Sequence, residues 1–178
     1  MDIEKEIATV CMKRDVIRIA RWIGTDQKRF SQLMDFILTG EDRIAQKAAW
    51  IVGYCVELHP PLVDPWLKQL LQKMEQPRAS GAVKRNGVRI LQFATIPRKL
   101  QGRAANICFQ FLAAPDEPIA VRTFSITVIA RIAEEEPDLM KELESVVKQM
   151  LPYSTPAFRA RAKKVLKNYQ YTEPIESP

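Results

Sequence analysis

The sequence predicts an all-α fold, an α-α superhelix (solenoid) of about four helical hairpins followed by a terminal helix. Two observations lead to this prediction. An apolar pattern with the period of a helix recurs about every 37 residues along the chain of 178 residues. Twelve prolines and only six glycines, with no Asn-Gly or Asp-Gly pair between alternating apolar runs, favour helix ends over β-hairpins. With 47% hydrophobic residues, the chain has enough apolar material for a core.

The first helix of each hairpin carries an apolar face that recurs four times. The segments RIAQKAAWIVGYC (43–55) and PIAVRTFSITVIA (118–130) show it most clearly. The spacing i, i+4, i+7, i+11 places four side chains on one side of a helix, and the second position is usually small. The four faces are Ile44, Ala48, Ile51 and Cys55; Val83, Gly87, Ile90 and Ala94; Ile119, Thr123, Ile126 and Ala130; Phe158, Ala162, Val165 and Tyr169.

The second helix of each hairpin follows a proline. Its apolar positions are Leu67, Leu70, Leu71 and Met74; Ala104, Ile107, Cys108 and Phe111; Leu143, Val146, Val147 and Met150. One such hairpin cannot bury its apolar side alone, so successive hairpins are expected to stack on their neighbours.

The two ends of the chain depart from this repeat. Residues 13–38 predict a shorter first hairpin, with Phe30, Leu33, Met34 and Ile37 on its core face, and residues 2–11 predict a capping helix. Residues 171–178 contain little to bury, so we expect a flexible C-terminal tail. The remaining residues, 1–170, are expected to form a single helical-repeat domain.

The pairing of AVRTFSITVIARI (120–132) with PDLMKELESVVKQML (137–151) resembles the HEAT and armadillo repeat superfamily, over roughly residues 41–170. Lys47, Arg122 and Arg161 match the recurring basic residue of that family's first helix. The hairpin that begins near Val83 departs from the pattern, because Asn86 stands where the basic residue is expected. The resemblance implies a solenoid that offers a surface for binding.

Composition argues against several kinds of chemistry. Cys11, Cys55 and Cys108 are far apart and lie within apolar helical patterns, and His59 is the one histidine, so we expect no metal, no cofactor and no catalytic triad. His59 precedes two prolines at a helix end, where a capping role is expected. Charged and polar residues interrupt every apolar run, which argues against a membrane span, and the acidic, amphipathic start argues against a secretory signal, so we expect a cytoplasmic protein.

The net charge of +6 is unevenly distributed. Two segments carry many basic residues and no acid, namely 78–103 and 148–167. An unpaired basic surface attracts nucleic acid or an acidic protein segment. Trp66 is expected in the groove of the solenoid, where an indole can stack on a ligand. The candidate binding residues are Trp66, Arg85, Arg89, Arg98, Lys99, Arg103, Asn106, Arg159, Arg161, Lys163 and Lys164.

Two functions fit these observations. The first is a non-enzymatic scaffold that binds a protein or an acidic peptide on the solenoid surface. The alternative is a nucleic-acid-binding protein that uses the two basic segments. Some helical-repeat proteins resemble DNA alkylation repair glycosylases, but no catalytic residue of that group has a match by motif here, and the expected groove lacks the corresponding acid. The sequence leaves the oligomeric state and the partner open.

Overall fold

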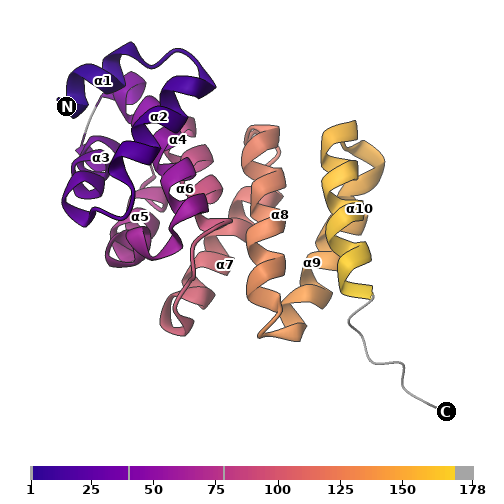
Figure 1. Cartoon of the computed structure of the whole chain (residues 1–178). Helices are drawn as coiled ribbons and strands as arrows, with labels where there is room; N and C mark the ends of the chain where they lie inside the picture. Colours follow the sequence, from indigo (N-terminus) through magenta and orange to yellow (C-terminus); the bar gives the residue numbers. More distant parts are fainter. Residues whose placement is uncertain (1, 40, 78, 171–178) are drawn as a thin grey trace. The chain divides into compact units, whose positions relative to one another are not determined.

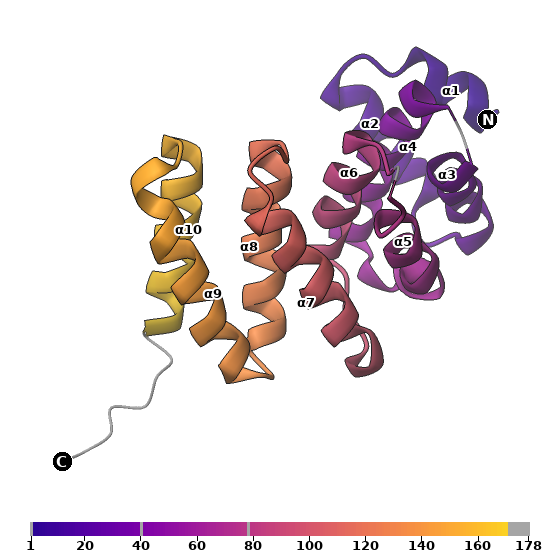
Figure 2. The same ribbon diagram turned by 180° about the vertical axis from the view of Figure 1, so that it is seen from behind.

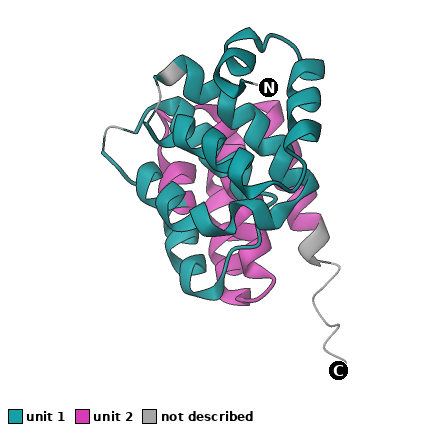
Figure 3. Ribbon diagram, turned by 60° about the vertical axis from the view of Figure 1, so that its left-hand side comes forward, with its two compact units in different colours: residues 1–107 teal, residues 108–178 magenta. Residues whose placement is uncertain are grey.

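The computed structural model describes residues 2–39, 41–77 and 79–170, and every regular element in these ranges is helical (Figure 1). The all-α prediction is therefore confirmed. The predicted tail at 171–178 and Arg78 of the first basic segment lie outside the described residues. The chain divides into two compact units, residues 1–107 and 108–178 (Figure 3). Two compact units can still fold as one domain, so the single domain over residues 1–170 stays a prediction.

Unit 1 begins with three helices, α1 (Ile3–Thr9), α2 (Lys13–Ile23) and α3 (Gln27–Thr39). The carboxylate of Asp2 caps α1 by accepting the backbone N–H of Lys5 at 3.4 Å. Gly24 ends α2 with a φ of +52°, a conformation that glycine adopts without strain, and the chain turns into α3. The helices expected within residues 2–11 and 13–38 are thus present. The predicted core face of residues 13–38 is buried: Phe30, Leu33, Met34 and Ile37.

The central helix of unit 1 is α4 (Asp42–Leu58), which contacts α1, α2, α3, α6 and the 3-10 helix η1 (Pro60–Trp66). Neighbours on several sides bury more of α4 than the one apolar face that the sequence predicted. Its buried side chains are mostly small or branched: Ala45, Ala48, Ala49, Ile51, Val52, Cys55 and Val56.

The helices α5 (Leu67–Met74) and α6 (Gly81–Leu91) pack against each other, although the sequence placed them in successive hairpins. Prolines remove backbone N–H donors from η1, so the chain enters α5 through a 3-10 helix. A Cβ atom on Gly87 would lie 2.3 Å from Sδ of the buried Met74, so the small residue predicted here lets α6 approach α5 closely. The helix α6 ends one turn before Ala94, the last position of the predicted face, although Ala94 is buried.

The boundary between the units falls within α7 (Arg98–Ala113). Unit 2 continues with α8 (Ile119–Ala133), α9 (Pro137–Met150), the 3-10 helix η2 (Leu151–Tyr153) and α10 (Pro156–Gln170). The helix α8 packs against both α9 and α10, and the three lie side by side when the molecule is viewed from the front and from behind (Figures 1 and 2). The described side chains that α10 buries are Phe158 and Ala162.

Candidate functional site

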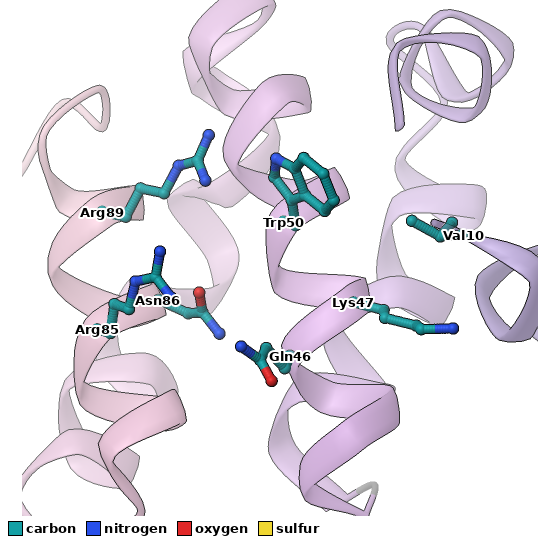
Figure 4. Close-up of a pocket in the computed structure, with 7 residues that line it drawn as sticks. All are labelled: Val10, Gln46, Lys47, Trp50, Arg85, Asn86 and Arg89. Atoms are coloured by element: carbon teal, nitrogen blue, oxygen red, sulfur yellow. The ribbon is translucent and has the colours of Figure 1, made fainter. Parts of the chain in front are cut away.

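A pocket of about 430 Å³ opens in unit 1 between α4, α6 and the residue that follows α1 (Figure 4). Helical spacing explains the lining, because residues 46 and 50 share one side of α4, and residues 85 and 89 share one side of α6. We call it the α4–α6 pocket. Of the described side chains that line it, three are basic, two are amides and none is a carboxylate. Its lining residues are Val10, Gln46, Lys47, Trp50, Arg85, Asn86 and Arg89.

The guanidinium of Arg89 is held in place without losing its hydrogen-bond donors. Its Cζ lies 5.6 Å from the centre of the Tyr54 ring, a cation–π contact. Gly53 makes room for it, because a Cβ there would lie 3.2 Å from Arg89 Nε. Arg89 makes no hydrogen bond or ion pair with any residue that the structure describes. Its N–H groups therefore remain available to a ligand.

Arg85 lies one helical turn before Arg89 and is exposed. Within the described ranges it too has no hydrogen-bond or ion-pair partner. Figure 4 shows both guanidinium groups on the α6 side of the pocket, with the Trp50 ring opposite on α4 and the indole nitrogen on the side toward Arg89. Two cations and an N–H donor thus border the same space.

Asn86 is 7% exposed and makes no hydrogen bond with the described chain. No fully buried side-chain nitrogen or oxygen among the described residues lacks a partner, so the amide of Asn86 must be reached from the pocket. In Figure 4 this amide and that of Gln46 approach each other from α6 and α4. The amide is therefore open to solvent or to a ligand that enters the pocket.

Lys47 has a different role, although it also borders the pocket. Its Nζ donates a hydrogen bond to the carbonyl of Ala8 at 2.6 Å, and in Figure 4 its side chain extends away from the arginines, on the side of Val10. Lys47 therefore ties α4 to the end of α1.

The other two residues at the recurring basic position act in the same way. In unit 2, Arg122 Nε donates to the carbonyl of Leu112 at 3.2 Å, and its guanidinium lies over the ring of Phe158, 5.5 Å from the centre. Arg161 Nη1 donates to Thr127 Oγ1 at 3.0 Å and so joins α10 to α8. The recurring basic residue thus serves packing wherever it occurs. Asn86 replaces it in α6, and there the polar group is left open to a pocket.

The structure brings together two of the predicted binding residues, Arg85 and Arg89. Arg103 already has a partner within the protein. Its Nε donates to both carboxylate oxygens of Glu75 at 3.0 Å, and its Nη2 donates to Oε2 of the same carboxylate. Its hydrogen bonds hold the pKa of Glu75 below the ordinary value. The other predicted residues of the first basic segment and the groove do not line the α4–α6 pocket: Trp66, Arg98, Lys99 and Asn106.

The sequence analysis expected a tryptophan that stacks on a ligand at Trp66, whereas the tryptophan that lines the pocket is Trp50. Gln46 and Asn86 line the pocket as well. Two signals in the sequence pointed toward these residues. Trp50 is a possible stacking surface in a first helix, and Asn86 interrupts the series of basic residues. Neither signal places the two side chains opposite each other, because that depends on how α4 and α6 pack.

The second basic segment lies in unit 2. Arg159, Lys163 and Lys164 are exposed on α10 and form no ion pair with a described residue. Arg161 is hydrogen-bonded to Thr127, and Lys148 pairs with Glu144 at 2.7 Å. The exposed basic residues Arg159, Lys163 and Lys164 thus all lie on one helix, α10.

The described residues contain no group of three or more His, Cys, Asp or Glu side chains that could hold a metal ion. Burial raises the pKa of the Cys55 and Cys108 thiols to about 12, so both are protonated at neutral pH and are poor nucleophiles. His59 ends α4, where its backbone N–H donates to the carbonyl of Cys55 at 2.7 Å. No described helix has the length and apolarity that a membrane crossing requires.

Comparison with known protein families matches residues 3–169, nearly the whole chain, to the HEAT repeat domain. Neither the curated proteins nor the solved structures include a significant match to this chain. The family match spans both compact units and agrees with the helical repeat described above.

Proposed function

This chain belongs to the HEAT repeat domain family, whose members commonly serve as scaffolds for protein interactions, and we propose that it is a non-enzymatic module that binds an acidic segment of a partner protein. The segment enters the α4–α6 pocket of unit 1. The cytoplasmic location expected from the sequence is part of this proposal. The partner is defined here by its chemistry, an extended peptide with at least one carboxylate or other anion.

The observation that carries the proposal is the pair of guanidinium groups, Arg85 and Arg89, that have no partner in the described chain and border a pocket whose described lining has no carboxylate. Their planar N–H groups match the two oxygens of an anion in a bidentate manner. A hydrogen bond to a charged group contributes about 1.5–3 kcal/mol, so each arginine supplies a useful part of the binding free energy. An acidic side chain is therefore the ligand group that the pocket favours.

The remaining lining supports a peptide as the rest of the ligand. Gln46 and Asn86 offer both donors and acceptors, which suit the N–H and C=O groups of a peptide backbone. Trp50 offers an apolar surface with an N–H at its edge, the combination that makes tryptophan frequent at interfaces. Val10 adds a small buried apolar contact.

The proposal is tested with a labelled peptide rich in Asp and Glu, and with the same peptide carrying Asn and Gln instead. Fluorescence anisotropy measures the affinity of both for the full chain at several salt concentrations. We expect the acidic peptide alone to bind, and Arg85→Gln with Arg89→Gln to weaken binding by about 10-fold or more. The matched control removes two charges from unit 2 with Arg159→Gln and Lys163→Gln.

The control decides whether the binding is local. The unit 2 variant should bind the acidic peptide within about 2-fold of the unaltered chain, because exposed cations that do not line the pocket contribute little. An equal loss in both double variants would show general attraction to a basic protein and would overturn the proposal. Circular dichroism confirms that each variant remains folded.

A second candidate function, nucleic-acid binding, has support of its own in unit 2. Arg159 and Lys163 are one turn apart on α10, and with Lys164 they form an exposed basic group without ion-pair partners in the described chain. Each phosphate contact contributes about −0.9 to the slope of log affinity against log salt concentration, so Arg159→Gln with Lys163→Gln should reduce that slope by about 1.8 with duplex DNA. An unchanged slope would refute this candidate.

A further inference from the structure

The α4–α6 pocket presents more donors than one carboxylate can use. Arg85 and Arg89 each carry five N–H donors, of which the described chain takes none. The indole N–H of Trp50 and the amides of Asn86 and Gln46 add further donors. A carboxylate has two oxygens and a single negative charge, so it leaves part of this set unsatisfied.

A phosphate monoester matches the set better. Near neutral pH it carries a charge of about −1.5 to −2 and three strong acceptor oxygens. Two guanidinium groups balance that charge, and the described lining of the pocket has no carboxylate that would repel it. The third oxygen can accept from Asn86 or from Trp50, which border the same space (Figure 4).

The site is also organised before any ligand arrives. Tyr54 and the absent side chain of Gly53 fix the position of the Arg89 guanidinium, and Asn86 is more than nine-tenths buried on a helix. Ordering these side chains therefore costs little on binding. Asn86 is mostly buried, but its amide makes no hydrogen bond within the described chain and is accessible from the pocket, so it is free to bind a ligand oxygen.

We infer that the α4–α6 pocket recognises a phosphorylated serine or threonine within the acidic segment of the partner. This inference rests on the proposed function and makes it more specific. The phosphate lies between Arg85 and Arg89, Asn86 donates to one of its oxygens, and the neighbouring peptide packs on Trp50.

The experiment uses three labelled peptides that differ only at the central residue, which is Ser, Glu or phosphoserine, in the same acidic background. We expect the phosphoserine peptide to bind at least about 10-fold more tightly than the Glu peptide, since a second charge-assisted hydrogen bond contributes about 1.5–3 kcal/mol. Equal affinities of these two peptides would overturn the phosphate inference and leave the acidic-segment function standing. No binding of any peptide would overturn the proposed function itself.

The pH dependence gives a second readout that a carboxylate ligand does not share. The second pKa of a phosphate monoester is about 6, so lowering the pH from about 7.5 to about 5.5 should weaken binding of the phosphoserine peptide and leave the affinity for the Glu peptide nearly unchanged. The charged groups that line the pocket are Lys47, Arg85 and Arg89, with Lys13 beside Tyr54, and the described lining has no histidine or carboxylate. Parallel pH curves for the two peptides would contradict the inference.

Two variants distinguish a fitted site from simple charge. Arg85→Lys keeps the charge on an exposed position and removes the planar fork, so the preference for phosphoserine over Glu should fall by about 10-fold. A preserved preference would refute bidentate recognition. Tyr54→Leu removes the ring under Arg89 and should lower the affinity for the phosphoserine peptide by about 2- to 30-fold. Tyr54→Phe keeps the ring and should retain the affinity.

Inorganic phosphate is the last arm, because it shares the ligand chemistry. We expect it to compete with the phosphoserine peptide only weakly, since it lacks the peptide contacts to Trp50. If inorganic phosphate bound as tightly as the phosphoserine peptide, the pocket would be a site for a small anion, and recognition of a phosphorylated protein segment would be overturned.

Discussion

The close contact between α5 and α6 leads to a prediction with a defined sign. An ideal Cβ on Gly87 would lie 2.3 Å from Met74 Sδ and 2.7 Å from Met74 Cγ. Ordinary contacts of this kind begin near 3.4 Å, so Gly87→Ala requires a shift of about 1 Å in a buried region. We therefore expect the substitution to destabilise unit 1.

The magnitude follows from two opposing effects. Overpacking a core costs about 1–3 kcal/mol. Replacing a glycine inside a helix by alanine contributes about 1 kcal/mol in the opposite direction. The contact is the larger effect, so Gly87→Ala should lower the free energy of unfolding by about 1 kcal/mol. Gly102 in α7 has no atom within 4 Å of its ideal Cβ, so Gly102→Ala should instead be stabilising, by up to about 1 kcal/mol.

A double-mutant cycle with Met74→Ala tests the cause of the loss. Truncating Met74 removes the clashing atoms, so Gly87→Ala should become neutral or stabilising in that background. The coupling free energy measured by urea denaturation should be about 1–3 kcal/mol. Additive effects, or a stabilising Gly87→Ala in the unaltered chain, would refute the conclusion that this glycine is required by packing. Gly102→Ala should show no coupling to Met74→Ala.

Two further predictions follow from the titrating groups. At about pH 8 a thiol with a pKa of about 12 is ionised in roughly one molecule in 10,000. A disulfide reagent should therefore modify the exposed Cys11 quickly, and the buried Cys55 and Cys108 only after unfolding. Rapid reaction of two thiols in the folded protein would contradict the burial of Cys55 and Cys108. Its hydrogen bonds with Arg103 lower the pKa of Glu75 from the ordinary value of a glutamate, so this pair stabilises the fold at neutral pH and the contribution is lost as the pH falls through the lowered pKa. Glu75→Gln should remove that part of the pH dependence of unfolding and, because the pair is partly exposed, cost no more than about 1 kcal/mol at neutral pH; an unchanged acid limb of the stability curve would count against the pairing.

The sequence and the structure agree best where the interaction is local. Residues three and four apart meet on a helix whatever the rest of the chain does, so the period of apolar residues was enough to locate the helices and the core face at Phe30, Leu33, Met34 and Ile37. Prolines lack an N–H, so helix ends near Pro61 and Pro97 were also readable. The 3-10 form of η1 and the early end of α6 could not be predicted, because the apolar pattern does not specify the type of the last turn of a helix.

The candidate site was predicted only in part. Arg85 and Arg89 were identified because no acid is near them in sequence. The same argument selected Arg103, but this arginine is paired. Its partner is Glu75, which lies 28 positions earlier, directly after α5, and contacts Arg103 on α7. Charge counts along a chain cannot show ion pairs between helices. For the same reason, the opposed positions of Trp50 and Asn86 were not foreseen.

By itself, the sequence determined the helical repeat, since helices with this period and these small residues bury their apolar faces by stacking on their neighbours. Only the tertiary structure decided what the recurring polar position does. Lys47, Arg122 and Arg161 reach groups on neighbouring helices, whereas Asn86 is too short to do so and opens into a pocket. The physical reason is that a side chain's partner depends on the distance and angle between packed helices, and these are fixed by contacts far apart in the sequence.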